Sequence, residues 1–350
     1  HLITIFSNWA LAFVNHTLNC RNKTIYHLKA GIKVAQDHDI YYFMWMNEED
    51  ILRVGQLCIE YNLKEIELYI AHLFALRPEG STVDILRRYI NQTPQKTKRM
   101  ALNILGYVHR FHLPRILVVT INNFSVYRND HRIKDEEWGG NLPQSLLKAI
   151  ITRGGRRVPK ERIMEDLWPD APQSASETNF KVNLHRLRKL LEPSMLKELG
   201  SSYIRLKGNL ISLDEELFEI DIDKFTELIR KAKNAKLEND SKYAIRYLNE
   251  AITLYQIDFL EEDLYNEAIS HKRDKLRQQY TGAMFQLAAL YETKGALKKA
   301  EDLYKKIIAS NPFADRAHQK LMINYANRGK NSEAIQTYLK YENALRTELD

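Results

Sequence analysis

The chain has 350 residues, of which 44% are hydrophobic and 28% are charged, and its formal net charge is +7. This length allows two or three domains with cores of their own, and the composition fits a soluble globular protein. The two cysteines, Cys20 and Cys58, exclude a disulfide framework and lack the spacing of a metal site. We therefore expect a cytoplasmic protein without a metal or other cofactor.

The chain begins at His1 rather than at an initiator methionine, so we interpret it as part of a longer protein. The opening stretch, residues 2–14, is apolar, but polar residues interrupt it and it is too short to span a bilayer. We expect a buried helix there and no membrane association.

Residues 1–113 predict helices throughout, because apolar residues recur at helical spacing, for example over residues 66–73. Gly31, Gly55 and Pro94 are interpreted as breaks between these helices. Two arrangements stay open for this region: degenerate repeats similar to tetratricopeptide repeats, or a plain helical bundle.

The next stretch is rich in β-branched and aromatic residues, over Ile116–Ile121 and Phe124–Tyr127. A turn at Asn129 and Asp130 leads to a third short extended segment, His131–Ile133. The pattern predicts a small antiparallel sheet.

Two helices follow the predicted sheet. The first covers Leu142–Thr152 and ends at Gly154 and Gly155, a strong stop signal. The second covers Pro159–Trp168 and begins with a proline in its first turn. A polar loop over Asp170–Ser174 then leads to a third helix.

The third predicted helix, Ser174–Leu191, has two chemically different sides. Phe180, Leu184, Leu187 and Leu191 lie on one stripe, spaced as successive turns of a helix require. The opposite side is cationic and carries a single valine. We expect the stripe to be buried and the opposite side to face the DNA major groove, which is about 12 Å wide.

A β-hairpin is predicted after this helix, over Ser202–Leu206 and Leu210–Leu213. Gly208 supplies positive φ at its tip, and Arg205 and Lys207 lie on its outer side. A sheet, three helices and a hairpin in this order predict a winged helix-turn-helix.

From Leu217 onward the sequence predicts helices with a measurable repeat. An offset of 34 residues, the length of a tetratricopeptide repeat, relates Tyr291 to Tyr325, Gly295 to Gly329, Ala300 to Ala334 and Tyr304 to Tyr338. A looser first unit covers Phe225–Ala251, and Glu261–Tyr280 predicts a long charged helix between the two. This region is expected to be a helical solenoid.

No Walker A, GxGxxG, HExxH or GxSxG signature is present in the sequence. His185 has no carboxylate at a spacing typical of catalysis, so we assign it to DNA or solvent contact. We predict a protein that is not an enzyme.

The cationic side of the third helix suggests how DNA would be contacted. Arg186 can donate to guanine O6 and N7, and Val182 can meet a thymine methyl group. Thr178, Lys181 and Arg188 are placed to reach phosphates, and the hairpin arginine can enter the adjacent minor groove. The candidate DNA-binding residues are Thr178, Lys181, Val182, His185, Arg186, Arg188, Arg205 and Lys207.

Residues 115–213 resemble the OmpR/PhoB-type winged helix, most clearly in ERIMEDLWPDAP, NLHRLRKLLEP and SYIRLKGNLISL. Residues 215–350 are similar to the bacterial transcriptional activator domain of SARP-type regulators. The preceding helical region resembles the end of a MalT-like repeat sensor region. The resemblance implies a transcription factor that binds repeated operator half-sites, often as a homodimer.

The loop Trp168–Ser176 matches the loop that contacts RNA polymerase in that family, which implies contact residues Trp168, Asp170 and Gln173. Thr178 and Lys181 differ from the residues common at their positions in the family, so the family's sequence preference does not carry over to this chain.

We therefore predict a mainly α protein with three domains: helices over 1–113, a winged helix-turn-helix over 114–214 and an activator domain over 215–350. The predicted function is sequence-specific binding of double-stranded DNA and activation of transcription through RNA polymerase. The helical repeats would couple a signal or bind a protein or peptide partner. The alternatives are an interaction scaffold and the C-terminal part of a larger signalling ATPase.

Overall fold

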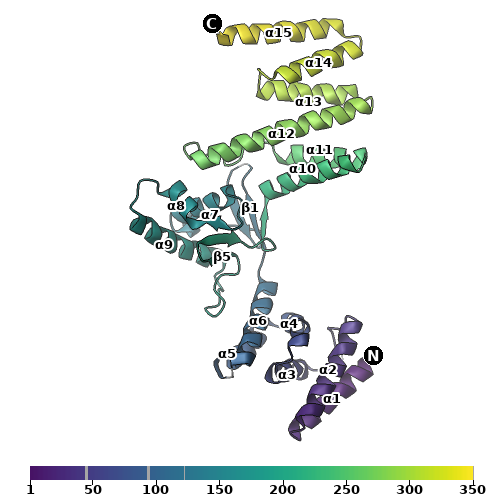
Figure 1. Ribbon diagram of the computed structural model, residues 1–350, viewed down its shortest axis with the longest axis vertical. Helices are drawn as coiled ribbons and strands as arrows, with labels where there is room; N and C mark the ends of the chain where they lie inside the picture. Colours follow the sequence, from purple (N-terminus) through teal and green to yellow (C-terminus); the bar gives the residue numbers. More distant parts are fainter. Residues whose placement is uncertain (44–45, 93–94, 122, 350) are drawn as a thin grey trace. The chain divides into compact units, whose positions relative to one another are not determined.

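The computed structural model describes residues 1–43, 46–92, 95–121 and 123–349, and it is mainly α as predicted (Figure 1). It forms two compact units, His1–Pro114 with Ser194–Ser202, and Arg115–Pro193 with Tyr203–Asp350. Over the described ranges, every helix is too short or too polar to cross a lipid bilayer.

The first unit is built from helices, and its core contains Trp9, Leu28, Ile32, Phe74 and Ile104, all buried. α1 packs against α2, and α5 packs against α6. Its elements are α1 (Leu2–Thr17), α2 (Arg21–Asp37), α3 (Glu48–Glu60), the 3-10 helix η1 (Lys64–Ile66), α4 (Glu67–Ala75), α5 (Glu79–Gln92) and α6 (Gln95–His112).

The expectation that Gly31 and Gly55 break helices is wrong, because they lie inside α2 and α3. Each glycine instead leaves room for an aromatic ring. A Cβ at Gly31 would lie 2.6 Å from Trp9, and one at Gly55 would lie 2.1 Å from Phe74. Pro94 lies outside the described residues.

Residues 194–202, which connect a helix and a strand of the second unit, pack as part of the first unit. Leu196 and Leu199 are half-buried against its core. Glu198 accepts from Arg87 of α5 over 3.0 Å.

The second unit begins with a four-stranded sheet in the order β3-β2-β1-β7. β1 pairs antiparallel with β2 and parallel with β7, and Asn129 and Asp130 form the turn between β2 and β3 with φ of 50° and 60°. The strands are β1 (Ile116–Val119), β2 (Ser125–Arg128), β3 (His131–Arg132) and β7 (Phe218–Ile220).

Strand β7 corrects the expectation that the chain is helical from Leu217. Phe218 and Ile220 are buried while Glu219 between them is exposed, which is the period of a strand. Asp221 then accepts from the backbone N–H groups of Thr120 and Ile121 over 2.7 and 2.8 Å. These bonds fasten the end of β7 to the end of β1, where the next helix begins.

Three helices and a second sheet complete the winged helix. Gly154 and Gly155 end the first of these helices with φ of 95° and 71°, as predicted. The sheet order is β4-β6-β5, so the wing hairpin gains a third strand. The elements are the 3-10 helix η2 (Asp135–Trp138), α7 (Asn141–Thr152), β4 (Val158–Pro159), α8 (Lys160–Leu167), α9 (Gln173–Leu191), β5 (Ile204–Lys207) and β6 (Leu210–Leu213).

The rest of the second unit is a stack of antiparallel helices, α10 to α15 (Figure 1). Gly295 and Gly329 have φ of 72° and 68° at equivalent turns, which agrees with the predicted repeat. The predicted helix Glu261–Tyr280 is too long at its start, because residues 261–266 lie in a loop. The helices are α10 (Asp221–Leu237), α11 (Ser241–Leu254), α12 (Glu267–Thr293), α13 (Leu297–Ser310), α14 (Asp315–Asn327) and α15 (Asn331–Leu349).

A buried carboxylate, Glu301, joins two helices of this stack. Only 2% of the residue is exposed, and it accepts from Lys305 at 2.7 Å, Lys298 at 2.9 Å and Arg328, which directly follows α14. Tyr325 also donates to it, over 3.3 Å. Burial opposes ionisation, but the hydrogen bonds outweigh it and lower the pKa of Glu301 to about 2.

We expect Glu301→Gln to destabilise the repeats by about 2 kcal/mol at pH 7, because the ionised carboxylate is stabilised relative to the unfolded chain. A carboxyl group whose pKa is lowered by folding stabilises the folded chain at pH values above its unfolded pKa, about 4.3. This stabilisation is lost as the pH falls toward the pKa of the folded state. The deficit of the variant should therefore shrink between pH 5 and pH 2. Urea unfolding measured across this range tests the expectation.

Glu227→Gln is the matched control. Glu227 is an exposed residue of α10 that pairs with Lys231 over 2.9 Å, so its loss should cost less than about 0.5 kcal/mol. A deficit of Glu301→Gln that stays constant from pH 5 to pH 2 would contradict an ionised, hydrogen-bonded Glu301.

Candidate DNA-binding surface

Helix α9 is fixed in the winged helix by the predicted apolar stripe. Phe180, Leu184, Leu187 and Leu191 are all buried, and α9 packs against α7 and α8. Each buried side chain of this size contributes roughly 1.5–3 kcal/mol, so the stripe determines which side of α9 remains exposed. The prediction that the stripe is buried is confirmed.

The start of α9 differs from the prediction. The helix begins at Gln173, directly after Pro172, so the predicted loop Asp170–Ser174 overlaps its first turn. Ser176 is buried, and its hydroxyl donates to the carbonyls of Pro172 and Ala171 over 3.4 and 3.5 Å. This serine therefore ties the first turn of α9 to the residues just before it.

The exposed side of α9 carries the predicted mixture of cations and one valine. Lys181, His185 and Arg186 are exposed, and Val182 between them is 44% exposed. Thr178 is also exposed, although its hydroxyl donates to the carbonyl of Ser174 over 2.9 Å. These residues share one surface.

Glu177 lies at the edge of this surface and orients two lysines. Its carboxylate accepts from Lys160 of α8, and Lys181 lies 3.7 Å from it. The hydrogen bond from Lys160 lowers the pKa of Glu177. Lys181 is thus a loosely paired cation whose ammonium group stays available to a phosphate.

Arg188 is placed differently from the other predicted residues. Its Nε donates to the carbonyl of Ile204 in β5 over 3.1 Å, and burial lowers its pKa. The side chain therefore ties α9 to the wing. The partial burial of Arg188 could have been inferred from the sequence, because Arg188 lies four residues after Leu184 and three before Leu191, beside the buried stripe.

The wing presents two further cations. Arg205 of β5 is exposed, but its guanidinium donates to the buried carboxylate of Asp214 over 2.8 Å. Lys207 is exposed at the end of β5, next to Gly208 at the hairpin tip with φ of 60°. The ion pair fixes the orientation of the Arg205 side chain. The position of Lys207 is set by the backbone of the hairpin.

The loop between α8 and α9 holds the remaining predicted residues. Trp168, at the end of α8, is half-buried, while Asp170 and Gln173 are exposed. The backbone N–H of Ala171 donates to the carbonyl of Trp168 over 3.2 Å, which closes the loop into a turn. Asp170 and Gln173 are therefore available to a partner.

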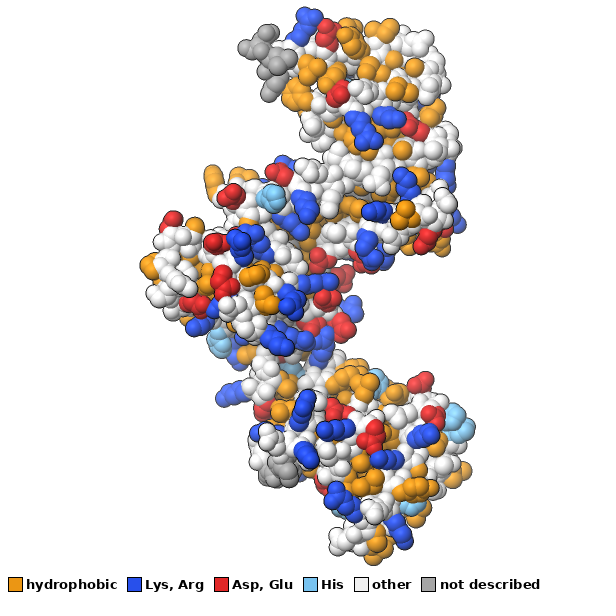
Figure 2. All heavy atoms as spheres, viewed as in Figure 1, with side chains coloured by type: hydrophobic (Ala, Val, Ile, Leu, Met, Phe, Trp, Pro, Cys, Tyr) orange, Lys and Arg blue, Asp and Glu red, His pale blue; other side chains and the backbone are white. Residues whose placement is uncertain are grey.

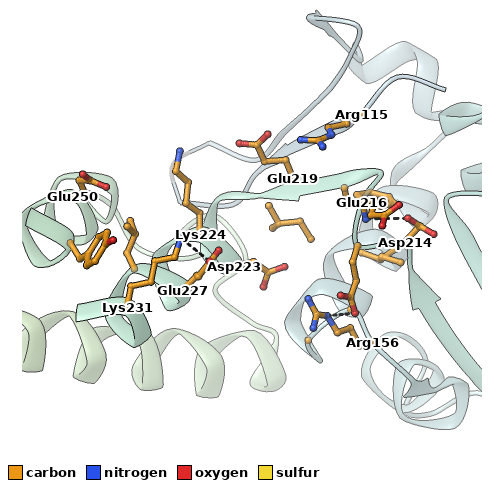
Figure 3. Close-up of a pocket in the computed structure, with 18 of the residues that line it drawn as sticks. Arg115, Arg156, Asp214, Glu216, Glu219, Asp223, Lys224, Glu227, Lys231 and Glu250 are labelled. Carbon is orange, nitrogen blue, oxygen red and sulfur yellow. Dashed lines mark hydrogen bonds and ion pairs between the residues drawn. The ribbon is translucent and has the colours of Figure 1, made fainter. Parts of the chain in front are cut away.

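A groove of about 780 Å³ lies between the base of the wing and α10 (Figure 3). Among the described residues, three ion pairs lie within the groove: Arg156 with Glu215 at 2.9 Å, Lys231 with Glu227 at 2.9 Å and Arg246 with Glu250 at 2.8 Å. The residues that line it include no serine, threonine, cysteine or histidine. It offers no nucleophile or general base of those types.

The charges of the molecule are mixed where the winged helix lies in Figure 2, with Lys and Arg side chains beside Asp and Glu side chains. The DNA-facing assignment therefore depends on the position of individual cations on α9 and the wing, and not on a broad basic field. In the described parts of the chain, no three His, Cys, Asp or Glu side chains group together as a metal site would require.

Comparison with known proteins gives a family match and two relatives. The model of the bacterial transcriptional activator domain matches residues 220–350. The regulatory protein AfsR of Streptomyces griseus is 22% identical over 214 residues, which are 60% of this chain and 21% of AfsR. AfsR of Streptomyces coelicolor is 23% identical over 211 residues, 60% of this chain and 20% of that protein. The chain thus spans about a fifth of the length of these relatives.

Among solved structures, Mycobacterium tuberculosis EmbR in complex with a low-affinity phosphopeptide shares the fold, with a TM-score of 0.58 and 15% sequence identity. The similarity covers 67% of this chain and 61% of the EmbR chain.

Proposed function

We propose that this chain is a SARP-type bacterial transcriptional regulator that binds a specific DNA sequence and activates transcription through RNA polymerase. The match of residues 220–350 to the bacterial transcriptional activator domain and the similarity to two AfsR proteins support this proposal. In this proposal α9 enters the major groove and the β5–β6 hairpin lies over the adjacent minor groove. The role is one of binding and not of catalysis.

The exposed side of α9 is the observation that carries the proposal. Val182, with a cation on each side of it along the helix, is 44% exposed and lies outside the buried stripe, so it contributes less to folding than a fully buried valine would. A base edge offers a partner to both kinds of side chain. Arg186 would donate to a guanine, and Val182 would contact a thymine methyl group. Lys181 and Thr178 would contact phosphates. Arg188 would act mainly by holding the wing against α9.

Selection of bound sequences from random duplexes, repeated at two salt concentrations, tests DNA binding and supplies the operator. With the selected operator, we expect Arg186→Ala to weaken specific binding by roughly 1–3 kcal/mol and to relax preference at one position. Lys181→Ala should instead weaken binding to all sequences alike and reduce the salt slope by about one.

Lys233→Ala supplies the matched control, because Lys233 is an exposed lysine of α10 outside this surface. If neither Arg186→Ala nor Lys181→Ala alters DNA affinity, the assignment of α9 is wrong. If the chain shifts no duplex at either salt concentration, the scaffold alternative replaces the DNA-binding proposal.

The α8–α9 loop is the proposed contact with RNA polymerase, through Trp168, Asp170 and Gln173. The exposure of Asp170 and Gln173 on a closed turn supports this role. The helical repeats of both units would bind a protein or peptide partner or couple a signal. Exposed Ile335, Tyr338 and Leu339 on α15 supply an apolar surface for such contacts.

A further inference from the structure

The loop between α11 and α12, residues 255–266, is fastened to the winged-helix part of the same unit. The backbone N–H of Leu260 donates to the carbonyl of Thr120 over 2.8 Å. Lys148 of α7, which is buried, donates to the carboxylate of Asp263 over 2.7 Å. Both bonds link the activator domain to the winged helix, so the loop keeps a fixed place beside it.

The same loop is also fixed from the side of α12. Arg273 is buried and donates to the backbone carbonyls of Phe259 over 2.9 Å and Asp263 over 3.2 Å. The side chain of Asn266 accepts from the backbone N–H of Ile269 over 3.0 Å and caps the helix. A loop held at so many points has little conformational freedom left to lose when it binds a partner.

Between these fixed points the loop exposes two large apolar side chains. Leu264 is 62% exposed and Tyr265 is fully exposed, at 101%. A single exposed apolar residue is ordinary on a protein surface. A leucine and a tyrosine that are adjacent, exposed and presented by a rigid loop form the arrangement of a preorganised binding hot spot.

Leu264 and Tyr265 share a hollow of about 550 Å³ with Pro169 of the α8–α9 loop. The apolar pair is therefore continuous with the loop to which we assign the polymerase contact. Apart from the Tyr265 phenol, the ionisable side chains that line the hollow are all carboxylates, those of Glu165, Asp166, Glu262, Asp263 and Glu267.

The charge of the hollow identifies the kind of partner. Asp166, Asp263 and Glu165 pair with Arg153, Lys148 and Arg162 respectively, but within the described part of the chain Glu262 makes no ion pair. Lys272 and Lys275 of α12 do not line this hollow; they line a neighbouring one that shares Glu165, Asp166, Glu267 and Ala268 with it. A negative surface repels DNA phosphates and attracts a basic polypeptide surface.

We propose that Leu264 and Tyr265 form, together with the α8–α9 loop, one docking surface for a basic and partly apolar patch of RNA polymerase. The inference rests on the proposed function and adds residues of the activator domain to the polymerase contact. The activator domain would then contact RNA polymerase directly, in addition to any role in coupling a signal.

A transcription assay tests the inference, with the full chain, RNA polymerase holoenzyme of the source organism and a template that carries the selected operator. We expect the double variant Leu264→Ala/Tyr265→Ala to lower activation by about tenfold or more while its DNA affinity stays within about twofold of wild type. Leu237→Ala/Tyr243→Ala is the matched control, since it removes an exposed leucine and tyrosine of the same domain that lie outside the hollow. The control should activate as wild type does.

Asp170→Ala separates failure of the inference from failure of the proposed function. If Asp170→Ala loses activation while the double variant keeps it, the polymerase contact stands and the inference is overturned. The inference is also overturned if the double variant loses enough DNA affinity to account for its loss of activation. If the wild-type chain occupies its operator without raising transcription, the proposed function fails, and the inference fails with it.

Discussion

Phe180→Ala is expected to destabilise the winged helix by about 3–5 kcal/mol and thereby to abolish DNA binding near the growth temperature. Phe180 is completely buried and is the first and largest side chain of the stripe that fixes α9, so alanine would leave a cavity that the surrounding helices fill only in part. A loss of this size is a large fraction of the stability of an ordinary domain.

Hydrogen exchange of the α9 amides and urea unfolding of the full chain measure this effect. The control is Val182→Ala, a smaller truncation to alanine on the opposite side of the same helix, where the side chain is 44% exposed. We expect it to change stability by less than about 0.5 kcal/mol while it weakens operator binding. Equal losses of stability in the two variants would contradict the assignment of buried and exposed sides.

Gly55→Ala is expected to destabilise the first unit by about 2–3 kcal/mol, although alanine is the better helix former. The new Cβ would lie 2.1 Å from one atom of the Phe74 ring and 2.4 Å from the next. Phe74 is completely buried, so its ring cannot turn aside without displacing other core residues. Thermal unfolding of the full chain, followed by circular dichroism, measures the change.

Gly106→Ala is the control for helix propensity. Gly106 lies inside α6 of the same unit, and a Cβ there would meet only the side chain of Leu199, at 3.8 Å. We expect this variant to be as stable as wild type or more stable by up to about 1 kcal/mol. If both variants were stabilised, Phe74 would not be packed against Gly55 as described.

Much of the fold follows from patterns that are local in the sequence. The stripe of α9, the turn at Asn129 and Asp130, and the repeat marked by Gly295 and Gly329 were predictable, because each depends on the spacing of neighbouring residues. The candidate DNA-facing residues on α9 follow from the same spacing. Once the stripe is buried, the opposite side has to be exposed.

Other features depended on partners far away along the chain. Phe218–Ile220 is too short to be recognised as a strand, and it becomes one because β1, about a hundred residues earlier, supplies its hydrogen bonds. The loop 261–266 was interpreted as helix, although Asn266 is a cap that could have marked the true start of α12. The sequence alone assigns no role to Tyr265 of this loop, because only the tertiary structure places the loop beside Pro169.

The sequence by itself therefore determined the order of elements, the buried stripe of α9 and the residues left on its opposite side, since hydrophobic period and turn residues act within a few positions. Only the tertiary structure decided that Gly31 and Gly55 accommodate rings, that Arg188 holds the wing and that Leu264 and Tyr265 adjoin the α8–α9 loop. Each of these depends on a close contact between segments distant in sequence, and the spacing of residues along a chain carries no record of such contacts.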